Sequence, residues 1–242
     1  MSKVSFENYK HLASMQDRNN TEVSGRYSFQ SEGERRILFD LLSKLELKVT
    51  DSLLEIGCGP GNLLVPLSSF CRTSTGIDNE ASLSRLKHRF DSETKIHCFS
   101  GDFLEMSLPE TSFDKIIIYS VLHYLSNIHE VLTFITRALS LLSPGGRMLI
   151  GDLPNTTKKS RFLRSTEGKK ISAQWEALVR EAETYEDVVL NIDTELITFD
   201  DAVVLDLIAF IRNKGFDSFL LPQSIDLPFG GSREDILVLA SS

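Results

Sequence analysis

The sequence predicts an α/β fold with a doubly wound, mostly parallel sheet. Short apolar stretches typical of strands alternate with helical patterns over the first 150 residues, as in parallel sheets with helices on both faces. Two final strand-like stretches, 216–221 and 236–240, are joined by a segment with no room for a crossover helix, so they must pair antiparallel. At 242 residues the chain is long enough for one sizeable α/β domain with a modest insertion.

The composition predicts a globular protein for which nucleic acid is a disfavoured substrate. The sequence is 41% hydrophobic and 25% charged, and its formal net charge is -8. Proteins that bind polyanions usually have the opposite balance, because Lys and Arg make the phosphate contacts. Nucleic acid is therefore disfavoured as a substrate, although a local basic patch is compatible with these numbers.

Signals for targeting and for metal binding are absent from the sequence pattern. No apolar run approaches the ~20 residues that span a bilayer, and the N-terminal residues lack the apolar core of a signal peptide. The three cysteines, Cys58, Cys71 and Cys98, have no metal-type spacing, and their odd number argues against a disulfide framework. We therefore expect a cytoplasmic protein with reduced thiols, no membrane partner and no metal.

The first 30 residues are polar with scattered aromatic side chains, and they form either a frayed end or an arm that covers a pocket as a lid. Behind them, Ser31 and Glu34 have the spacing of a capping box. Apolar residues then recur at helical spacing. The predicted division is an arm over 1–30 and a single domain over 31–242.

Five strands and the helices between them account for the next part of the chain. Strands are predicted at 52–56, 73–78, 95–99, 113–119 and 147–151, and helices at 62–71, 80–90 and from Asn127 to Leu142. The strand 113–119 contains three consecutive isoleucines, and a continuous β-branched run is typical of a central strand that is covered on both faces.

The alternation breaks between 152 and 198, where we expect a helical insertion on the substrate side. Basic residues cluster between 158 and 170, and a helix is predicted over 172–189. Such an insertion borders the carboxyl edge of the sheet, where ligands bind. A last helix begins after a cap at 198–201 and ends at a glycine stop.

A buried strand that ends in an acid, Glu55, is followed by a turn of alternating glycines and a helix start. Open α/β sheets bind nucleotide-like cofactors at such turns, because glycine lets the backbone bend sharply or approach a ligand closely. The dinucleotide fingerprint has a third glycine where this chain has Asn62. The spacing here is instead Gly57-x-Gly59-x-Gly61.

Acidic residues follow the next two strands. Asp78 ends the second strand, where a carboxylate can accept hydrogen bonds from both ribose hydroxyls, and a helix N-cap aspartate is the alternative. Asp102 and Phe103 follow the third strand, where the carboxylate could accept from an adenine amine and the ring could lie near the base. A turn aspartate followed by a core phenylalanine is the alternative there.

These stretches together resemble the successive motifs of the class I S-adenosylmethionine-dependent methyltransferases. The stretches that carry the resemblance are Glu55–Gly61, Gly76–Asp78, Gly101–Phe103, Phe113–Asp114 and Leu142–Arg147. The resemblance covers residues 31–154 and the terminal hairpin, and its specificity comes from the order and spacing of the motifs. It implies a Rossmann-like, seven-stranded sheet whose last strand is antiparallel.

The resemblance also implies a cofactor, S-adenosyl-L-methionine, with S-adenosyl-L-homocysteine as its product and no metal. The loop of Gly57, Gly59 and Gly61 would surround the methionyl part together with Glu55. The ribose would be held by Asp78, with Asn79 beside it, and the adenine by Asp102 and Phe103. Ser120 would line the methionyl side after the fourth strand. The residues that the resemblance places around the cofactor are therefore Glu55, Gly57, Gly59, Gly61, Asp78, Asn79, Asp102, Phe103 and Ser120.

The chemistry of methyl transfer needs little from the protein beyond alignment, and alignment can supply on the order of 7–11 kcal/mol. A general base is needed only if the acceptor holds a proton at neutral pH. His123, in the loop after the fourth strand, is the best base candidate because an imidazole has a pKa near ~6.5; a wall residue or a helix start is the alternative. Asp152, after the fifth strand, is the second candidate, with a helix cap as the alternative.

The sequence says less about the acceptor. We predict that Tyr27, Tyr124, Arg161 and Arg164 contact it, with the two arginines gripping a phosphate or carboxylate. A solvated basic face is the alternative for the arginines. The stretches around 151–155 and 227–237 are loosely similar to methyltransferases of bacterial surface-sugar and polysaccharide biosynthesis. The predicted reaction is methyl transfer to oxygen or nitrogen of a small metabolite that is sugar-like or bears a phosphate.

Three other functions stay open. A nicotinamide-dependent oxidoreductase is disfavoured by Asn62 and by the terminal hairpin. A non-catalytic protein that binds the nucleoside and regulates or scaffolds a partner would keep the same glycine loop and acids. Methylation of RNA or protein is disfavoured by the net charge but is compatible with the basic cluster. The sequence makes no prediction about the oligomeric state.

Overall fold

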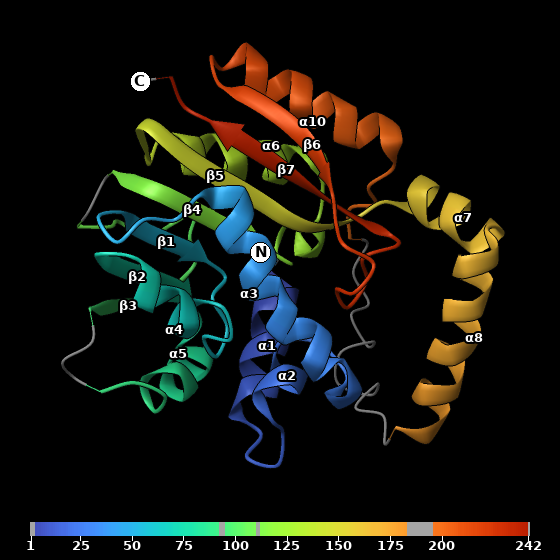
Figure 1. Ribbon diagram of the computed structural model, residues 1–242. Coiled ribbons are helices and arrows are strands. Elements are labelled where there is room, and N and C mark those ends of the chain that lie inside the picture. The colour runs from blue at the N-terminus through green and yellow to red at the C-terminus, as the bar shows by residue number, and fades with distance from the viewer. Residues whose placement is uncertain (1–2, 92–94, 110–111, 183–195, 242) are drawn as a thin grey trace.

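A seven-stranded sheet crosses the centre of the protein, and helices lie on both of its faces (Figure 1). The structure is a computed structural model, and it describes residues 3–91, 95–109, 112–182 and 196–241. The strands are β1 (Ser52–Ile56), β2 (Thr73–Asp78), β3 (Ile96–Ser100), β4 (Phe113–Tyr119), β5 (Leu142–Pro154), β6 (Asp217–Pro222) and β7 (Arg233–Leu239). Their order across the sheet is β3-β2-β1-β4-β5-β7-β6.

The directions of the strands confirm the predicted fold class. Strands β1 to β5 pair in parallel, whereas β7 pairs antiparallel with β5 on one side and with β6 on the other. The strand order reverses between β1 and β4. In open α/β sheets such a reversal leaves a crevice at the carboxyl ends of the two strands, and ligands bind there.

The core lies on both faces of the sheet, with β4 in its middle. The three isoleucines of β4, residues 116–118, are 0% exposed, and successive side chains of a strand point to opposite faces. Ile116 and Ile118 belong to the cluster that also contains α6 (Ile128–Leu139) and α10 (Asp201–Asn213). Ile117 belongs to the cluster on the other face, with α3 (Ser31–Leu45) and α5 (Glu80–Lys87). The prediction of a central strand covered on both faces is confirmed.

Two predicted helix ranges are wrong in their bounds. The helix expected over 62–71 is one α-helical turn, α4 (Leu64–Leu67), followed by a 3₁₀ turn at Ser68–Phe70. The nitrogen of Pro66, inside that turn, has no hydrogen to donate. Leu142, expected on the buried face of a helix, is instead the first residue of β5, because α6 ends at Leu139.

The capping box predicted at the start of α3 is also wrong. Helix α3 begins at Ser31, but its N-cap is Gln30, which makes no side-chain capping bond. The Glu34 carboxylate accepts hydrogen bonds from Thr21 and Arg26 instead of reaching back to the helix start. A buried guanidinium competes successfully with a local cap because a charged hydrogen bond is about twice as strong as a neutral one.

The insertion after β5 begins with two helices rather than one. Helix α7 (Thr156–Arg164) is capped by the side chain of Asn155, and α8 (Thr166–Glu181) by that of Ser165. The last part of the predicted helix, residues 183–189, lies outside the described residues. In Figure 1, α7 and α8 stand to the side of the sheet, next to the end of β5. None of the helices in the described ranges is long and apolar enough to cross a membrane.

The N-terminal segment packs on the domain through α1 (Lys3–Ser14) and α2 (Asn20–Val23). Helix α1 lies against α5, and Arg85 of α5 donates hydrogen bonds to the carbonyl oxygens of Ala13 (2.7 Å) and Arg18 (2.8 Å). A cation at the C-terminal end of a helix also interacts favourably with the helix dipole. The described part of the arm is therefore docked across the carboxyl ends of β1 and β2, where it can contribute to a site.

Candidate functional site

The glycine turn after β1 has the backbone that its sequence predicts. Gly57, Gly59 and Gly61 have φ angles of 78°, 53° and 80°. Residues other than glycine rarely adopt such positive φ angles. A Cβ atom on Gly57 would lie 2.4 Å from the Cγ2 atom of Val121. The Gly59 N–H points at the end of β2 and donates to the Asp78 carboxylate over 2.8 Å.

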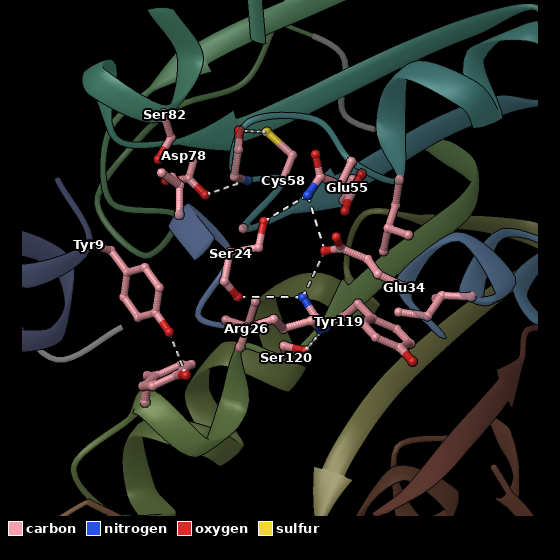
Figure 2. A pocket seen from close by; sticks show the side chains of 18 residues that line it. Tyr9, Ser24, Arg26, Glu34, Glu55, Cys58, Asp78, Ser82, Tyr119 and Ser120 are labelled. Carbon is pink, nitrogen blue, oxygen red and sulfur yellow. Dashed lines mark hydrogen bonds and ion pairs between the residues drawn. The ribbon is translucent and has the colours of Figure 1, made fainter. Parts of the chain in front are cut away.

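A cavity opens beside this turn, between the carboxyl ends of β1, β2 and β4 and the N-terminal arm (Figure 2). Its empty volume is about 620 Å³, counting the space at its mouth, which is in the range of small-molecule sites. The polar and aromatic side chains in its wall are those of Tyr9, Ser24, Arg26, Glu34, Glu55, Asn62, Asp78, Ser82, Tyr119, Ser120 and Tyr124.

A second cavity, of about 330 Å³, adjoins the first. The two cavities share Gly57, Asp78 and Val121 in their walls. Asp102 and Phe103 line the second cavity. The Asp102 carboxylate accepts a hydrogen bond from the backbone N–H of Leu104. The Phe103 ring packs on that of Phe134, which lines the same cavity, with ring centres 4.8 Å apart. Together the cavities form an elongated site with an aromatic, acidic far end.

Asp78 lies at the junction of the two cavities and is held in place by three N–H donors. They are the backbone N–H groups of Gly59 and Asn79 and the side-chain amide of Asn79. Burial raises the pKa of the Asp78 carboxyl, and these hydrogen bonds oppose the rise. The helix cap at the start of α5 is Asn79, which accepts from the N–H of Ser82. The N-cap alternative for Asp78 is therefore wrong.

Glu55, one residue before the end of β1, lines the first cavity. The residue is buried, with 3% of its surface exposed. Within the described part of the chain, its Oε2 atom has no hydrogen-bond partner. Burial, reinforced by the neighbouring Asp78, raises the pKa of the Glu55 carboxyl well above its usual value.

Arg26, which sequence reasoning did not single out, is a buried cation of the first cavity. Its guanidinium lies 3.2 Å from the Glu34 carboxylate and donates to the Ser120 hydroxyl over 2.9 Å (Figure 2). It also lies 3.7 Å from the Asp152 carboxylate. These charged partners raise the pKa of Arg26 although burial alone would lower it. The arm sequence around Arg26 has no periodicity or motif that would have marked this residue in advance.

Ser120 directly follows β4, and Asp152, predicted to follow the fifth strand, lies inside β5 near its end. Both residues have the left-handed backbone conformation, with φ angles of 59° and 60°. The Ser120 N–H donates to the carbonyl oxygen of Gly151, and the Ser120 hydroxyl donates to the Asp152 carboxylate. The other carboxylate oxygen of Asp152 lies 3.6 Å from Arg233. Asn155, not Asp152, caps the following helix, so the helix-cap alternative for Asp152 is wrong. Its contacts favour a role in positioning Arg26 and Ser120.

His123 lies in a 3₁₀ turn, Leu122–Tyr124, and does not line either cavity. Burial, together with the nearby Arg233, lowers the pKa of His123 to about 3, so the imidazole is neutral at physiological pH. Its Nδ1 atom is buried and, as far as the described residues go, unpartnered. The role of general base predicted for His123 stays a prediction. A base with so low a pKa is a weak one at neutral pH.

The four residues predicted to contact the acceptor lie in different places. Tyr124 lines the first cavity and accepts a hydrogen bond from Tyr9 of the arm. Tyr27 lies outside that cavity, in an aromatic cluster. Arg161 pairs with Asp201 on the exposed surface of α7, and Arg164 is exposed at the end of the same helix. Neither arginine lines the cavity, so a grip on an anion by these two residues stays a prediction.

The aromatic cluster joins the arm, the insertion and the terminal hairpin. Trp175 of α8 meets Tyr27 and Phe29 edge to face, with ring centres 5.5 and 5.2 Å apart. It also contacts Phe229 at 5.6 Å. Trp175 lies in the helix predicted over 172–189, but its ring partners come from segments far away in the chain.

The strand order, the glycine turn and the acids at the ends of β1, β2 and β3 define the class I S-adenosylmethionine-dependent methyltransferase fold. Residues 54–150 match the model of the methyltransferase domain family, so the chain carries a domain of this class and the predicted family is confirmed. The methyl donor of the class is S-adenosyl-L-methionine. No group of three or more His, Cys, Asp or Glu side chains that could hold a metal ion occurs within the described ranges.

Three known proteins illustrate the similarity. The chain is 29% identical to nodulation protein S of Sinorhizobium fredii over 50% of its own length and 55% of that protein. It is 30% identical to 27-O-demethylrifamycin SV methyltransferase of Amycolatopsis mediterranei over 50% of its length and 45% of that protein. The crystal structure of the N-methyltransferase NodS of Bradyrhizobium japonicum with S-adenosyl-L-homocysteine superimposes with a TM-score of 0.62, at 17% identity, over 99% of this chain and 100% of that chain. The chain spans about half the length of the curated relatives it matches.

Proposed function

We propose that the protein binds S-adenosyl-L-methionine in the two joined cavities and transfers its methyl group to oxygen or nitrogen of a small acceptor. The observation that carries the proposal is the position of Asp78, at the junction of a glycine-turn cavity and an aromatic cavity. When bound, the donor supplies a methyl group that its sulfonium sulfur already activates. The residues of the chain then have to bind the donor, orient the acceptor and shield both from water.

The residues around the cavities fit such a donor. We assign the ribose hydroxyls to Asp78 and the adenine to Asp102 and Phe103, which line the second cavity. We assign the methionyl end of the donor to Glu55 and Arg26. Glu55 has an unpartnered buried oxygen for a cationic amine, and Arg26 has a buried Nε with no partner among the described residues for a carboxylate. A buried polar atom without a partner costs free energy until a ligand supplies one.

On the acceptor side, we assign Ser120 and Tyr124 to orientation, because both line the first cavity at the end of β4. The arm excludes water, since Tyr9 bonds to Tyr124 across the cavity and Arg26 ties the arm to Ser120.

The acceptor that we propose is a small metabolite, sugar-like or phosphate-bearing. The relatives support a small acceptor in general terms, since one of them is named as a methyltransferase of 27-O-demethylrifamycin SV. Arg233, stacked 4.9 Å from the Phe229 ring and next to Asp152, adds a cation near the predicted acceptor side. A protein that only binds the donor and regulates a partner is the second candidate.

Calorimetric titration with S-adenosyl-L-homocysteine tests the donor site. In Asp78→Asn the affinity is expected to fall about 10- to 100-fold, because a charge-assisted hydrogen bond contributes about 1.5–3 kcal/mol. Asp217→Asn, an exposed residue at the start of β6, is the matched control and should bind like the wild type. Unchanged binding in Asp78→Asn, with the fold intact by thermal melting, would refute the assignment. Release of S-adenosyl-L-homocysteine with a panel of amino sugars and phosphorylated amines separates the enzyme from the non-catalytic candidate.

A further inference from the structure

Three carboxyl groups line the first cavity, and they differ in how they are compensated. Asp78 accepts from three N–H donors. Glu34 pairs with Arg26 at 3.2 Å and accepts from the hydroxyl of Thr21. Glu55 is buried like Glu34, but its Oε2 atom has no donor among the residues that the structure describes. One carboxyl of the cavity therefore lacks the contacts that keep a buried carboxylate charged.

The charge balance of the cavity wall makes this difference important. The wall holds three carboxyls, those of Glu34, Glu55 and Asp78, and one guanidinium, that of Arg26, a formal charge of -2 if all are ionised. An uncompensated buried charge is expensive, and a carboxyl in that position takes up a proton instead. The least compensated group, Glu55, is the one that does so.

We propose that Glu55 is protonated in the donor-free protein and that it exchanges this proton for the ammonium group of the donor. The proton passes to solvent, and the carboxylate that remains forms an ion pair with the bound ammonium, so charge is conserved. Glu55 then selects ligands that carry a cationic amine, and binding is linked to pH. The inference rests on the proposed function of the site.

The other titratable groups that face Glu55 do not compete for this exchange. Those that line the cavity with Glu55 come from β2, the glycine turn, α3, the arm, β4 and the turn after it, and are Asp78, Cys58, Glu34, Tyr9, Arg26, Tyr119 and Tyr124. Burial raises the pKa of the Cys58 thiol and of the Tyr119 hydroxyl, so both stay neutral and give up no proton at neutral pH. The three N–H donors of Asp78 and the guanidinium beside Glu34 already hold those two carboxylates.

The direction in which donor affinity changes with pH follows from the direction in which the pKa of Glu55 is shifted. Burial raises the pKa of Glu55 in the donor-free protein, and an ammonium partner lowers it again in the complex. Between these two pKa values the free protein holds one more proton than the complex. Affinity therefore rises with pH by up to about tenfold per pH unit in this window, and it is constant above the pKa of the donor-free state.

The experiment is a calorimetric titration of the wild type with S-adenosyl-L-homocysteine between pH 5 and 8, in buffers of low and high ionisation enthalpy. We expect the apparent binding enthalpy to depend on the buffer with a slope of up to about one proton released per site. Titration with 5′-methylthioadenosine, which has the nucleoside and no amino-acid part, should show no release. In Glu55→Gln the release with S-adenosyl-L-homocysteine should disappear, while thermal melting reports the fold.

Each outcome is decisive. Proton release that needs both Glu55 and the amino-acid part of the ligand supports the proposal. Binding of S-adenosyl-L-homocysteine without release by the wild type, release with both ligands, or release that persists in Glu55→Gln overturns it. If Glu55→Gln does not fold, the comparison of the two ligands on the wild type still decides. Failure of the wild type to bind S-adenosyl-L-homocysteine at all would instead refute the proposed function.

Discussion

The imidazole of His123, whose Nδ1 atom is buried, leads to a quantitative prediction about stability and pH. In the folded protein its pKa is lowered to about 3, mainly by burial, from an ordinary value of 6.5. Between these two values the unfolded chain binds a proton that the folded chain does not. The stability contributed by the neutral imidazole is therefore complete above pH 6.5 and is lost as the pH falls toward 3.

The size of this loss of stability follows from the shift in the pKa of His123. One pKa unit corresponds to about 1.36 kcal/mol, and pH 5 lies 1.5 units below the ordinary value of 6.5. The wild type should therefore lose about 2 kcal/mol through His123 between pH 7.5 and pH 5. In His123→Gln this loss should be absent, even if the variant is less stable at both pH values because the ring no longer packs on Tyr124.

The assay is urea denaturation of the wild type and His123→Gln at pH 7.5 and pH 5. The quantity of interest is the difference between the two pH-dependent changes in the free energy of unfolding. The buried carboxyls with raised pKa values contribute with the opposite sign, but equally in both proteins, so they cancel. His129→Gln, at an exposed position of α6, is the matched control and should keep the wild-type pH dependence.

Parallel stability curves for the wild type and His123→Gln between pH 5 and pH 7.5 would refute this reasoning. The imidazole would then gain its proton as readily in the folded protein as in the unfolded chain. In that case His123 would regain the ordinary pKa on which its predicted role as a general base depends.

Two further predictions concern the glycine turn and the insertion. Gly57→Ala should lower the free energy of unfolding by about 2–4 kcal/mol in urea titrations, because backbone strain adds to a Cβ only 2.4 Å from Val121. Gly59→Ala, whose Cβ would have its nearest neighbour at 3.8 Å, should cost only the strain of about 1–2 kcal/mol. Equal losses would contradict the role of the contact. Trp175→Ala should speed hydrogen exchange of α8 by about 10-fold or more, because the variant loses three aromatic pairs that contribute about 0.5–1.5 kcal/mol each. Unchanged exchange would show that the cluster does not hold the insertion.

Much of the donor site could be predicted from local sequence pattern. Glu55 and Asp78 are far apart in the chain, but each lies at or next to the end of a strand, and the carboxyl ends of neighbouring parallel strands meet at one edge of the sheet. The glycine turn is equally local, since its positive φ angles depend on the residues of the turn itself. The same reasoning failed at Glu34, whose spacing to Ser31 is that of a cap but whose partner is Arg26.

The sequence by itself determined the class of fold, the family and the strand ends that form the donor cavities, because these depend on periodicity and turn chemistry within short stretches. Only the tertiary structure decided which side chains complete the site and in what protonation state. Arg26 meets a hydroxyl 94 residues away at Ser120, and the Asp152 backbone N–H meets a carboxylate 83 residues away at Asp235. Burial and charge pairing set the pKa values of His123 and Glu55, and both depend on contacts that no local pattern encodes.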